Sequence, residues 1–333
     1  MTMKATARAH PIQGLVKYHG IRDQEKRHPY HDSISLCTAP TSSTTTVEWQ
    51  PDASEDTYVI DGEEVDGHAA ERIVNVVDHV RELSGSDHAV RLESENSFPS
   101  NIGFGSSASG FAAAALALTE AAGLDMTLPD VSAVARRGSS SAARAVTGAY
   151  SILETGLNDE DCRSYRLDVG EGEDGFHPEE DLRVIACHVP AYKETEQAHE
   201  EAAASHMMDA RMAHVHDQLV EMKDALREGA FDRIYGTAEH DSLSRTATTM
   251  TGPSGWVYWQ PETIEVFNAV RELRNEKDVP VYFSTDTGAS VYVNTREEYV
   301  DRVEARIAEI GIETDVWEVG GPAHILDESE ALF

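Results

Sequence analysis

A loop rich in proline, glycine and serine runs directly into an apolar segment, and this junction is the feature that most limits the possible fold. The loop covers residues 99–110 and reads PSNIGFGSSASG, and the alanine-rich segment covers residues 111–118. Backbone N–H groups at a helix start carry partial positive charge, and glycine allows a close approach, so such a junction suits a phosphate. Taken alone, the string favours an ordinary serine-capped turn before a core helix. Its surroundings favour an anion site.

The charge of the chain is strongly negative everywhere except around this loop. The chain has 60 acidic and 27 basic residues and a formal net charge of -33, yet residues 96–153 contain three of each sign. Most of the surface would repel an anionic ligand, whereas this region would not. We expect no nucleic-acid partner, because binding a phosphate backbone needs a basic face.

The distribution of charge also indicates the source of the protein. Lysine occurs only six times, and acidic residues are spread along the whole chain. This pattern is typical of cytoplasmic proteins of salt-accumulating halophiles, in which strong screening makes a large net charge tolerable. Hydrophobic residues make up 40% of the chain, which excludes an acidic disordered protein.

Length, cysteines and hydropathy predict a cytoplasmic protein of two domains. The 333 residues are enough for two domains. The three cysteines lack metal-type spacing and indicate a reducing compartment. The N-terminal residues lack the apolar core of a signal peptide, and no apolar run approaches the roughly 20 residues of a membrane span.

Hydrophobic patterns predict a mixed α and β chain. Helical spacing of apolar residues predicts helices over 69–83 and 208–226, and another helix follows the glycine loop. Thr295 and Glu298 predict a capping box for a helix that stops at Gly311. The acidic segment 158–180 indicates a long hairpin or loop. β-branched or alternating patterns predict strands over 4–8, 33–38, 44–49, 88–93, 184–189, 281–283 and 290–293.

Three polar elements are candidates for chemistry. Lys17 follows an apolar pair, and its alternative is a surface lysine whose stem covers apolar groups. The segment RRGSSSAAR at 136–144 offers hydroxyls and a guanidinium to a carboxylate or phosphate, or forms a flexible serine turn. Asp286, in TDTG, is either a base or an ordinary turn aspartate.

The histidines of the helical middle do not predict a metal site. Their spacing does not match the His-Glu-x-x-His zinc pattern, so surface histidines are the expected interpretation. These residues are His199, His206, His214 and His216.

Four motifs in chain order resemble the signatures of one family. They are KYHGIRD at 17–23, NSFP at 96–99 running into GFGSSA at 103–108, RGSSSAAR at 137–144 and TDTG at 285–288. Together they resemble the mevalonate diphosphate decarboxylase branch of the GHMP kinase superfamily. The resemblance covers nearly the whole chain, and its specificity comes from the order of the motifs.

The resemblance implies an α+β fold of two domains. Residues 1–190 would form an ATP-binding GHMP domain that is similar to ribosomal protein S5 domain 2. Residues 191–333 would form a helix-rich, ferredoxin-like C-terminal domain, with the last strands packing back across the cleft. ATP and Mg²⁺ would bind with the substrate in the cleft, and the family resemblance also implies a homodimer.

The resemblance also implies a role for each motif. Asp286 would orient or deprotonate the 3-hydroxyl of a mevalonate, and Lys17 would pair with Asp286 and counter developing negative charge. Tyr18 would contact the substrate phosphate. The ligands of the magnesium ion are left unassigned. Gly103, Gly105, Ser106 and Ser107 would cradle the phosphates of ATP, and Ser139, Ser141 and Arg144 would hold the substrate carboxylate.

Departures from the family pattern bear on the substrate. The implied reaction is phosphorylation of the 3-hydroxyl by MgATP, followed by loss of phosphate and CO2 to leave an alkene. Relatives that use the diphosphate typically read KYWGKR, and here the tryptophan is His19 and the second lysine is Ile21. After Lys193, the family's SSTxGM is replaced by residues 194–199, ETEQAH. A pocket with fewer phosphate partners and added carboxylates favours one phosphate over two.

We therefore expect (R)-5-phosphomevalonate as substrate and isopentenyl phosphate as product. Mevalonate 5-diphosphate, giving isopentenyl diphosphate, is the main alternative. A mevalonate 3-kinase that does not decarboxylate, or a ligand sensor without catalysis, are less favoured because the whole polar set is retained.

Overall fold

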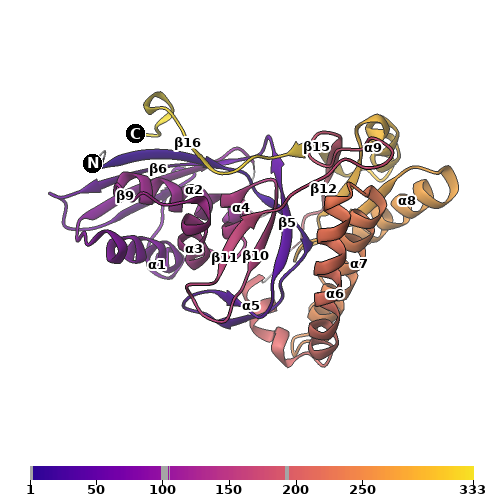
Figure 1. Ribbon diagram of the computed structural model, residues 1–333, viewed down its shortest axis with the longest axis horizontal. Coiled ribbons are helices and arrows are strands. Elements are labelled where there is room, and N and C mark those ends of the chain that lie inside the picture. Colours follow the sequence, from indigo (N-terminus) through magenta and orange to yellow (C-terminus); the bar gives the residue numbers. More distant parts are fainter. Residues whose placement is uncertain (1–2, 99–103, 105, 192–194) are drawn as a thin grey trace.

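Two large sheets, one small hairpin and two groups of helices make up the described part of the chain (Figure 1). The computed structural model describes residues 3–98, 104, 106–191 and 195–333, except for the side chains of residues 68, 69, 106, 195 and 196. The first sheet and helices α1 to α4 form one end of the molecule, and helices α6 to α9 form the other (Figure 1). A second sheet connects them.

The first sheet is covered by helices on one side. Its strand order is β16-β1-β6-β9-β7-β8, and every pair is antiparallel except β7 with β9. Helix α2 is almost wholly apolar, and its many alanines allow it to lie close against β1 and β6. The strands are β1 (Lys4–Ala9), β6 (Ser43–Gln50), β7 (Thr57–Ile60), β8 (Glu63–Glu64), β9 (Ala89–Asn96) and β16 (His324–Ile325), and the helices are α1 (Gly67–Ser84), α2 (Ser106–Ala121), α3 (Leu128–Gly138) and α4 (Ala142–Thr147).

The second sheet crosses the whole molecule. Its strand order is β11-β10-β5-β15-β12-β14-β13, with β2 paired to β5. Strands from both parts of the chain alternate in it, because β15 inserts between β5 and β12. The strands are β2 (Ile12–Val16), β5 (Ser33–Ala39), β10 (Tyr150–Glu154), β11 (Arg163–Arg166), β12 (Leu182–His188), β13 (Val281–Ser284), β14 (Val291–Arg296) and β15 (Glu313–Val319). A small hairpin, β3 (Ile21–Asp23) with β4 (His28–Pro29), follows β2.

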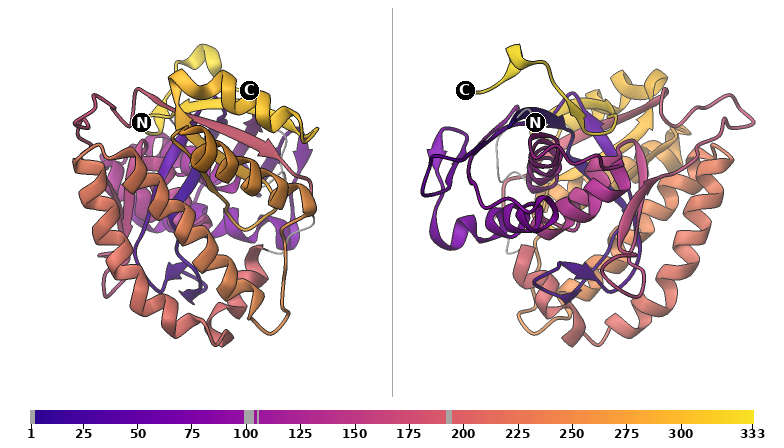
Figure 2. Two further views of the ribbon diagram at one scale, coloured as in Figure 1. Left: turned by 90° about the vertical axis from the view of Figure 1, so that its right-hand side faces the viewer. Right: turned by 60° about the vertical axis from the view of Figure 1, so that its left-hand side comes forward.

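Helices α6 and α7 form a long antiparallel pair against the second sheet (Figure 2). The inner face of this pair shares a buried apolar cluster with strands β2, β5, β10 and β12. Helices α8 and α9 pack on strands β12 to β14 through a separate cluster. The helices are α5 (Thr195–Glu201), α6 (Met208–Arg227), α7 (Phe231–Met250), α8 (Pro261–Lys277) and α9 (Val300–Ala308), and single 3₁₀ turns cover Ala202–Ala204, Glu297–Tyr299 and Glu328–Glu330.

Most of the expected elements are confirmed. All seven predicted strands are present, as are the helices predicted over 69–83, over 208–226 and after the glycine loop, with ends shifted by a few residues. The fourth predicted helix, which was expected to stop at Gly311, is present as α9 but begins later. The segment 158–180 is mostly loop, but it contributes strand β11 to the second sheet.

The predicted capping box at Thr295 is wrong. Thr295 is still in β14, and its hydroxyl donates to the carbonyl of Pro280, so it does not cap a helix. A 3₁₀ turn follows, and α9 ends at Ala308, before Gly311. Helices α3, α4, α5, α7 and α8 were not predicted. In α7, polar residues such as Asp241 and Arg245 lie on the buried face and obscure the helical period.

The ends of the chain return to the first sheet. Strand β16 pairs with β1, after the chain has passed through the helical part of the molecule. The family-based division at residue 190 stays a prediction, since the second sheet takes strands from both sides of it. No helix among the described residues is long and apolar enough to cross a membrane.

We predict that Gly148→Ala destabilises the protein. Gly148 has φ of 72°, and an added Cβ would lie 2.2 Å from the backbone nitrogen of Pro322. The C-terminal segment is held there by backbone hydrogen bonds, such as Ala149 N–H to Gly320 O at 2.8 Å. The change should lower the free energy of unfolding by about 3 kcal/mol, measured by urea unfolding in molar KCl.

Gly62→Ala is the matched control for this prediction. Gly62 also has positive φ, 82°, but nothing lies within 4 Å of its added Cβ. It should cost only about 1 kcal/mol. Equal effects of the two changes would contradict the proposed clash with the C-terminal segment.

Candidate active site

Lys17 directly follows strand β2, and its ammonium group is buried. Nζ donates to Ser242 Oγ at 3.0 Å and lies 3.6 Å from Oδ2 of Asp241 on α7. The side chain of Asp241 is fully buried, and its Oδ1 accepts from Arg211 Nη2 at 3.0 Å. Burial lowers the pKa of Lys17, although the carboxylates of Asp241 and Asp286 oppose this. Lys17, Asp241 and Arg211 are called the buried ion cluster below.

Asp286 lies on the turn between β13 and β14, with both carboxylate oxygens held. Oδ1 accepts from the backbone N–H of Gly14 at 3.3 Å, and Oδ2 accepts from the hydroxyl of Tyr292 at 3.1 Å. Arg245 on α7 donates to the backbone oxygen of Asp286 and to Thr287 Oγ1, at 3.3 and 2.9 Å. The carboxylate is therefore fixed in orientation.

Gly14 lies between Lys17 and Asp286. An added Cβ at Gly14 would lie 2.6 Å from Lys17 Cγ and 2.9 Å from Asp286 Oδ1, so both side chains contact this residue. The expected ion pair of Lys17 with Asp286 is not present in the described part of the chain; Lys17 pairs with Asp241. The reason is that Asp241 needs compensating charge more, because it is completely buried.

Arg144, Ser139 and Ser141 come together at the start of α4. The guanidinium of Arg144 lies 5.5 Å from the centre of the Tyr18 ring. Nε and Nη1 of Arg144 are buried without a hydrogen-bond partner, and burial lowers the pKa of Arg144 to about 10. Ser139 Oγ and Ser141 Oγ are 3.2 Å apart. A buried guanidinium with unused donors indicates an anion site.

A cavity of about 430 Å³ lies between α1, α2 and strands β7 and β9. Ser107, at the exposed start of α2, is part of its lining, together with apolar groups such as Phe111. Gly103 and Gly105 of the predicted phosphate cradle lie outside the described residues, and Ser106 starts α2 without a described side chain. Sequence reasoning found this loop but missed the cavity.

Two aromatic residues connect this region to the rest of the site. Phe104, in the glycine loop, contacts Tyr292 edge-on at 5.1 Å, and Tyr292 binds Asp286. Phe111 lines the cavity and lies against Gly138, where an added Cβ would be 2.1 Å from its ring. Phe104 thus packs against a residue that holds Asp286, and Gly138, beside the serine segment, packs against a residue that lines the cavity.

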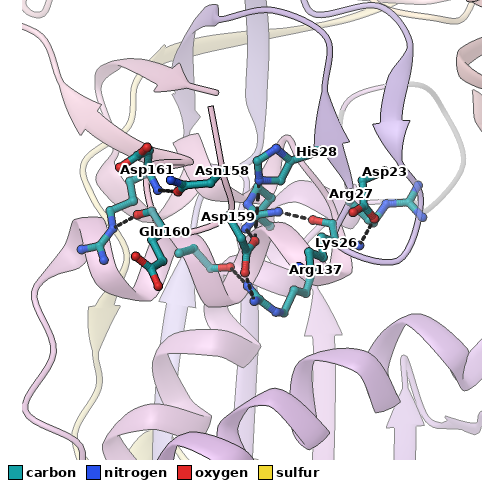
Figure 3. Close-up of polar contacts among 12 residues, drawn as sticks. Asp23, Lys26, Arg27, His28, Arg137, Asn158, Asp159, Glu160 and Asp161 are labelled. Carbon is teal, nitrogen blue, oxygen red and sulfur yellow. Dashed lines mark hydrogen bonds and ion pairs between the residues drawn. The ribbon is translucent and has the colours of Figure 1, made fainter. Parts of the chain in front are cut away.

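Asp159 connects the serine segment to the β3–β4 hairpin (Figure 3). It accepts from Arg136 and from Arg137 Nη2, the latter at 2.6 Å, and it lies 3.6 Å from Nε2 of His28. Arg136 also donates to the backbone oxygen of Lys26. Burial raises the pKa of Asp159, but the hydrogen bond and charge of Arg136, together with Arg137, hold it at about 2.

One of the four histidines is not a surface residue. His206, His214 and His216 are exposed, whereas His199 is 8% exposed and stacks on Tyr18 with ring centres 4.8 Å apart. The surface interpretation is therefore wrong for His199. Helix α5 lies beside the turn that follows β2, which could not be inferred from the spacing.

Several site residues were missed by sequence reasoning. Asp241, Ser242 and Arg245 share a buried face of α7, and Arg211 faces them from α6. The available signal was a helix whose inward positions are polar, with acid and base four residues apart. Among the described residues, no group of three His, Cys, Asp or Glu is arranged to hold a metal.

The fold and these paired groups define the class of protein. The family model described as the diphosphomevalonate decarboxylase-like N-terminal domain matches residues 9–164. The fold is that of the GHMP kinases, as expected. The chain belongs to the diphosphomevalonate decarboxylase-like family.

One relative is similar over its whole length. Phosphomevalonate decarboxylase of Haloferax volcanii is 72% identical over 99% of this chain and 100% of its own length. Diphosphomevalonate decarboxylase of Bos taurus is 28% identical over 88% of this chain and 77% of its own length. The resemblance drawn from the four motifs is confirmed.

Solved structures are similar across the same length. Mevalonate diphosphate decarboxylase from Staphylococcus aureus matches with a TM-score of 0.91 and 26% identity, over 98% of this chain and 99% of that one. A complex described as MDDEF with MVAPP, AMPPCP and magnesium matches with a TM-score of 0.89 and 25% identity, with the same coverage.

We predict that Asp159→Asn destabilises the protein because it leaves the fully buried Arg136 without its counter-charge. The loss should be roughly 3 kcal/mol at pH 7. Since the folded-state pKa of Asp159 is depressed, the wild-type advantage is present above about pH 4 and is lost as pH falls toward 2. Urea unfolding at several pH values measures this.

Asp161→Asn serves as the control, because Asp161 is exposed and two residues away. It should unfold at the same urea concentration as wild type. If the gap between Asp159→Asn and wild type stayed constant from pH 5 to pH 2, the assigned role of the charge would be wrong.

Proposed function

We propose that this protein converts (R)-5-phosphomevalonate to isopentenyl phosphate, CO2, ADP and phosphate. The observation that carries the proposal is Asp286, whose carboxylate is held by Gly14 and Tyr292 while Lys17 lies on the other side of Gly14. The 72% identity to the phosphomevalonate decarboxylase of Haloferax volcanii supports the choice of substrate.

Arg144, Ser139 and Ser141 are assigned to the substrate carboxylate. The buried guanidinium of Arg144, whose Nε and Nη1 have no hydrogen-bond partner among the described residues, would donate to the carboxylate. The neighbouring hydroxyls of Ser139 and Ser141 supply further donors. Tyr18 would lie along the substrate, since its ring is in contact with Arg144 at one side and His199 at another.

Asp286 is assigned to the 3-hydroxyl of the substrate. A fixed carboxylate accepts the hydroxyl hydrogen and aims the oxygen for phosphoryl transfer, where positioning and electrostatics supply most of the catalysis. Lys17 provides a buried positive charge across Gly14 from Asp286, which stabilises negative charge as phosphate and CO2 leave. Asp241 keeps this ammonium group in place.

The cavity beside α2 fits a nucleoside, and the helix start fits its phosphates. Its apolar lining suits a base, and Ser107 lies where the helix begins. Gly103, Gly105 and Ser106 are assigned to the same phosphates from the resemblance. Bound MgATP supplies the phosphoryl group that turns the 3-hydroxyl into a leaving group. Mg²⁺ commonly keeps waters and phosphate oxygens as ligands, so it needs few protein groups.

The first test is CO2 release by the purified protein in molar KCl with MgATP. We expect release from (R)-5-phosphomevalonate and little from mevalonate or mevalonate 5-diphosphate. A preference for the diphosphate would favour the alternative decarboxylase, and ADP without CO2 would identify a 3-kinase. No turnover of any substrate would favour a ligand sensor. Light scattering in the same buffer tests the homodimer expected from the family, and a cytoplasmic location is proposed on the same basis.

We predict that Asp286→Asn lowers kcat roughly 10³-fold and changes KM little, because the amide keeps the shape but cannot accept the proton. Steady-state CO2 release measures both constants. Asp301→Asn, an exposed change on α9, should behave as wild type. A kcat of Asp286→Asn close to the wild-type value would overturn the assignment.

A further inference from the structure

We propose that His199 binds the phosphate of the substrate through its Nε2–H group and favours one phosphate over two. This inference rests on the proposed function and assigns one residue to its specificity. Four observations carry it: the place of the ring, its tautomer, the cations around it and the rigid support of α5.

The imidazole of His199 lies where the far end of the substrate is expected. Its ring stacks on Tyr18, with centres 4.8 Å apart and planes 14° from parallel. The guanidinium of Arg144 contacts the same tyrosine at 5.5 Å. Tyr18 is therefore a neighbour both of the guanidinium assigned to the carboxylate and of His199. A mevalonate chain with a carboxylate at one end and a phosphate at the other would extend along that ring.

The backbone decides which ring nitrogen carries the proton. Gly20 N–H points at Nδ1 of His199 at 3.3 Å, so Nδ1 accepts. Gly20 has φ of 82°, a conformation that other residues rarely adopt. In a neutral imidazole whose Nδ1 accepts, the proton is on Nε2. Among the described residues, Nε2 has no hydrogen-bond partner, although the side chain is more than nine-tenths buried.

The charged groups around His199 favour an anion. Burial lowers the pKa of His199, and the positive charges of Arg245 and Arg27 lower it further. His19, on the Tyr18 side, is 5.5 Å away between ring centres and is also kept neutral by burial and by neighbouring arginines. In a chain of net charge -33, an N–H donor on a buried side chain that lies in the field of two arginines suits a phosphate.

Helix α5 is held rigidly enough to preset the ring. Glu201 accepts from the backbone N–H of Ser254 at 2.9 Å and from its hydroxyl at 2.6 Å. Gln197 donates to Glu201 at 2.8 Å, and Ser205 bonds Thr251 at 2.6 Å. These hydrogen bonds connect the residues before and after His199 to the segment that follows α7. A donor that is already in place loses little entropy when it binds.

The same position also favours a substrate with one phosphate over a substrate with two. A neutral imidazole offers one hydrogen bond and no charge, whereas a second phosphate brings further negative charge that needs cations. Ile21, which stands where diphosphate-using relatives read lysine, is a buried apolar residue here. His199 itself stands where the family motif reads methionine. The neutral donor of His199 and the apolar Ile21 thus favour one phosphate over two.

The test compares three variants by calorimetric binding and by CO2 release. His199→Met removes the donor and restores the family residue, and His199→Gln returns an N–H near the position of Nε2. His216→Met is the control, because His216 is exposed on α6. The ligands are (R)-5-phosphomevalonate, mevalonate 5-diphosphate and mevalonate, which has no phosphate.

We expect His199→Met to bind 5-phosphomevalonate roughly 30-fold more weakly and mevalonate less than about 3-fold more weakly, as for loss of a hydrogen bond to a charged group. Its preference for one phosphate over two should fall in proportion. His199→Gln should recover most of the affinity, and His216→Met should match wild type.

Equal losses for 5-phosphomevalonate and mevalonate, or no recovery in His199→Gln, would overturn the proposal. A second measurement uses the wild-type protein labelled with ¹⁵N-histidine. Adding 5-phosphomevalonate should move one Nε2 resonance, and this resonance is assigned to His199 by its absence from the spectrum of His199→Gln. An unmoved resonance under saturation would also overturn it. Wild-type protein that releases no CO2 from 5-phosphomevalonate would instead refute the proposed function.

Discussion

The buried ion cluster is the interaction on which the rest of the site depends. Asp241 accepts from the backbone N–H of Lys17 at 2.9 Å and from Arg211 at 3.0 Å. A fully buried carboxylate is unfavourable unless it is paired and hydrogen-bonded, so only one placement of helices α6 and α7 against strand β2 satisfies it. That placement brings Lys17 beside Gly14 and therefore beside Asp286.

The two sheets bring the remaining groups to this cluster. Phe104 contacts Tyr292, which holds Asp286, and Phe111, which lines the cavity beside α2, packs against Gly138. Asp159 connects the serine segment to the hairpin after β2. Each part of the site that is assigned to a ligand is thus packed against another part. This packing explains how phosphoryl transfer and decarboxylation can share one site.

The acidic composition and the basic site have complementary roles. Most of the groups that give the net charge of -33 are exposed to solvent, where salt screens them. Arg144, Arg211 and Arg245, in contrast, are buried around the site. These buried arginines favour an anionic substrate at the site. Screening in molar salt weakens the repulsion of the surface more than the attraction of buried cations, so a halophilic surface is compatible with an anionic substrate.

The sequence by itself determined the fold family, seven of the sixteen strands in the described residues and the choice of Lys17, Arg144 and Asp286 as candidates, because these residues lie in short motifs or alternating patterns. Only the tertiary structure decided which charges pair. Asp241 and Arg211 occur in helices without a motif, and His199 has the spacing of a surface residue. Their roles depend on contacts across more than 170 residues of chain, such as that of Gly20 with His199, and local periodicity carries no information about such contacts.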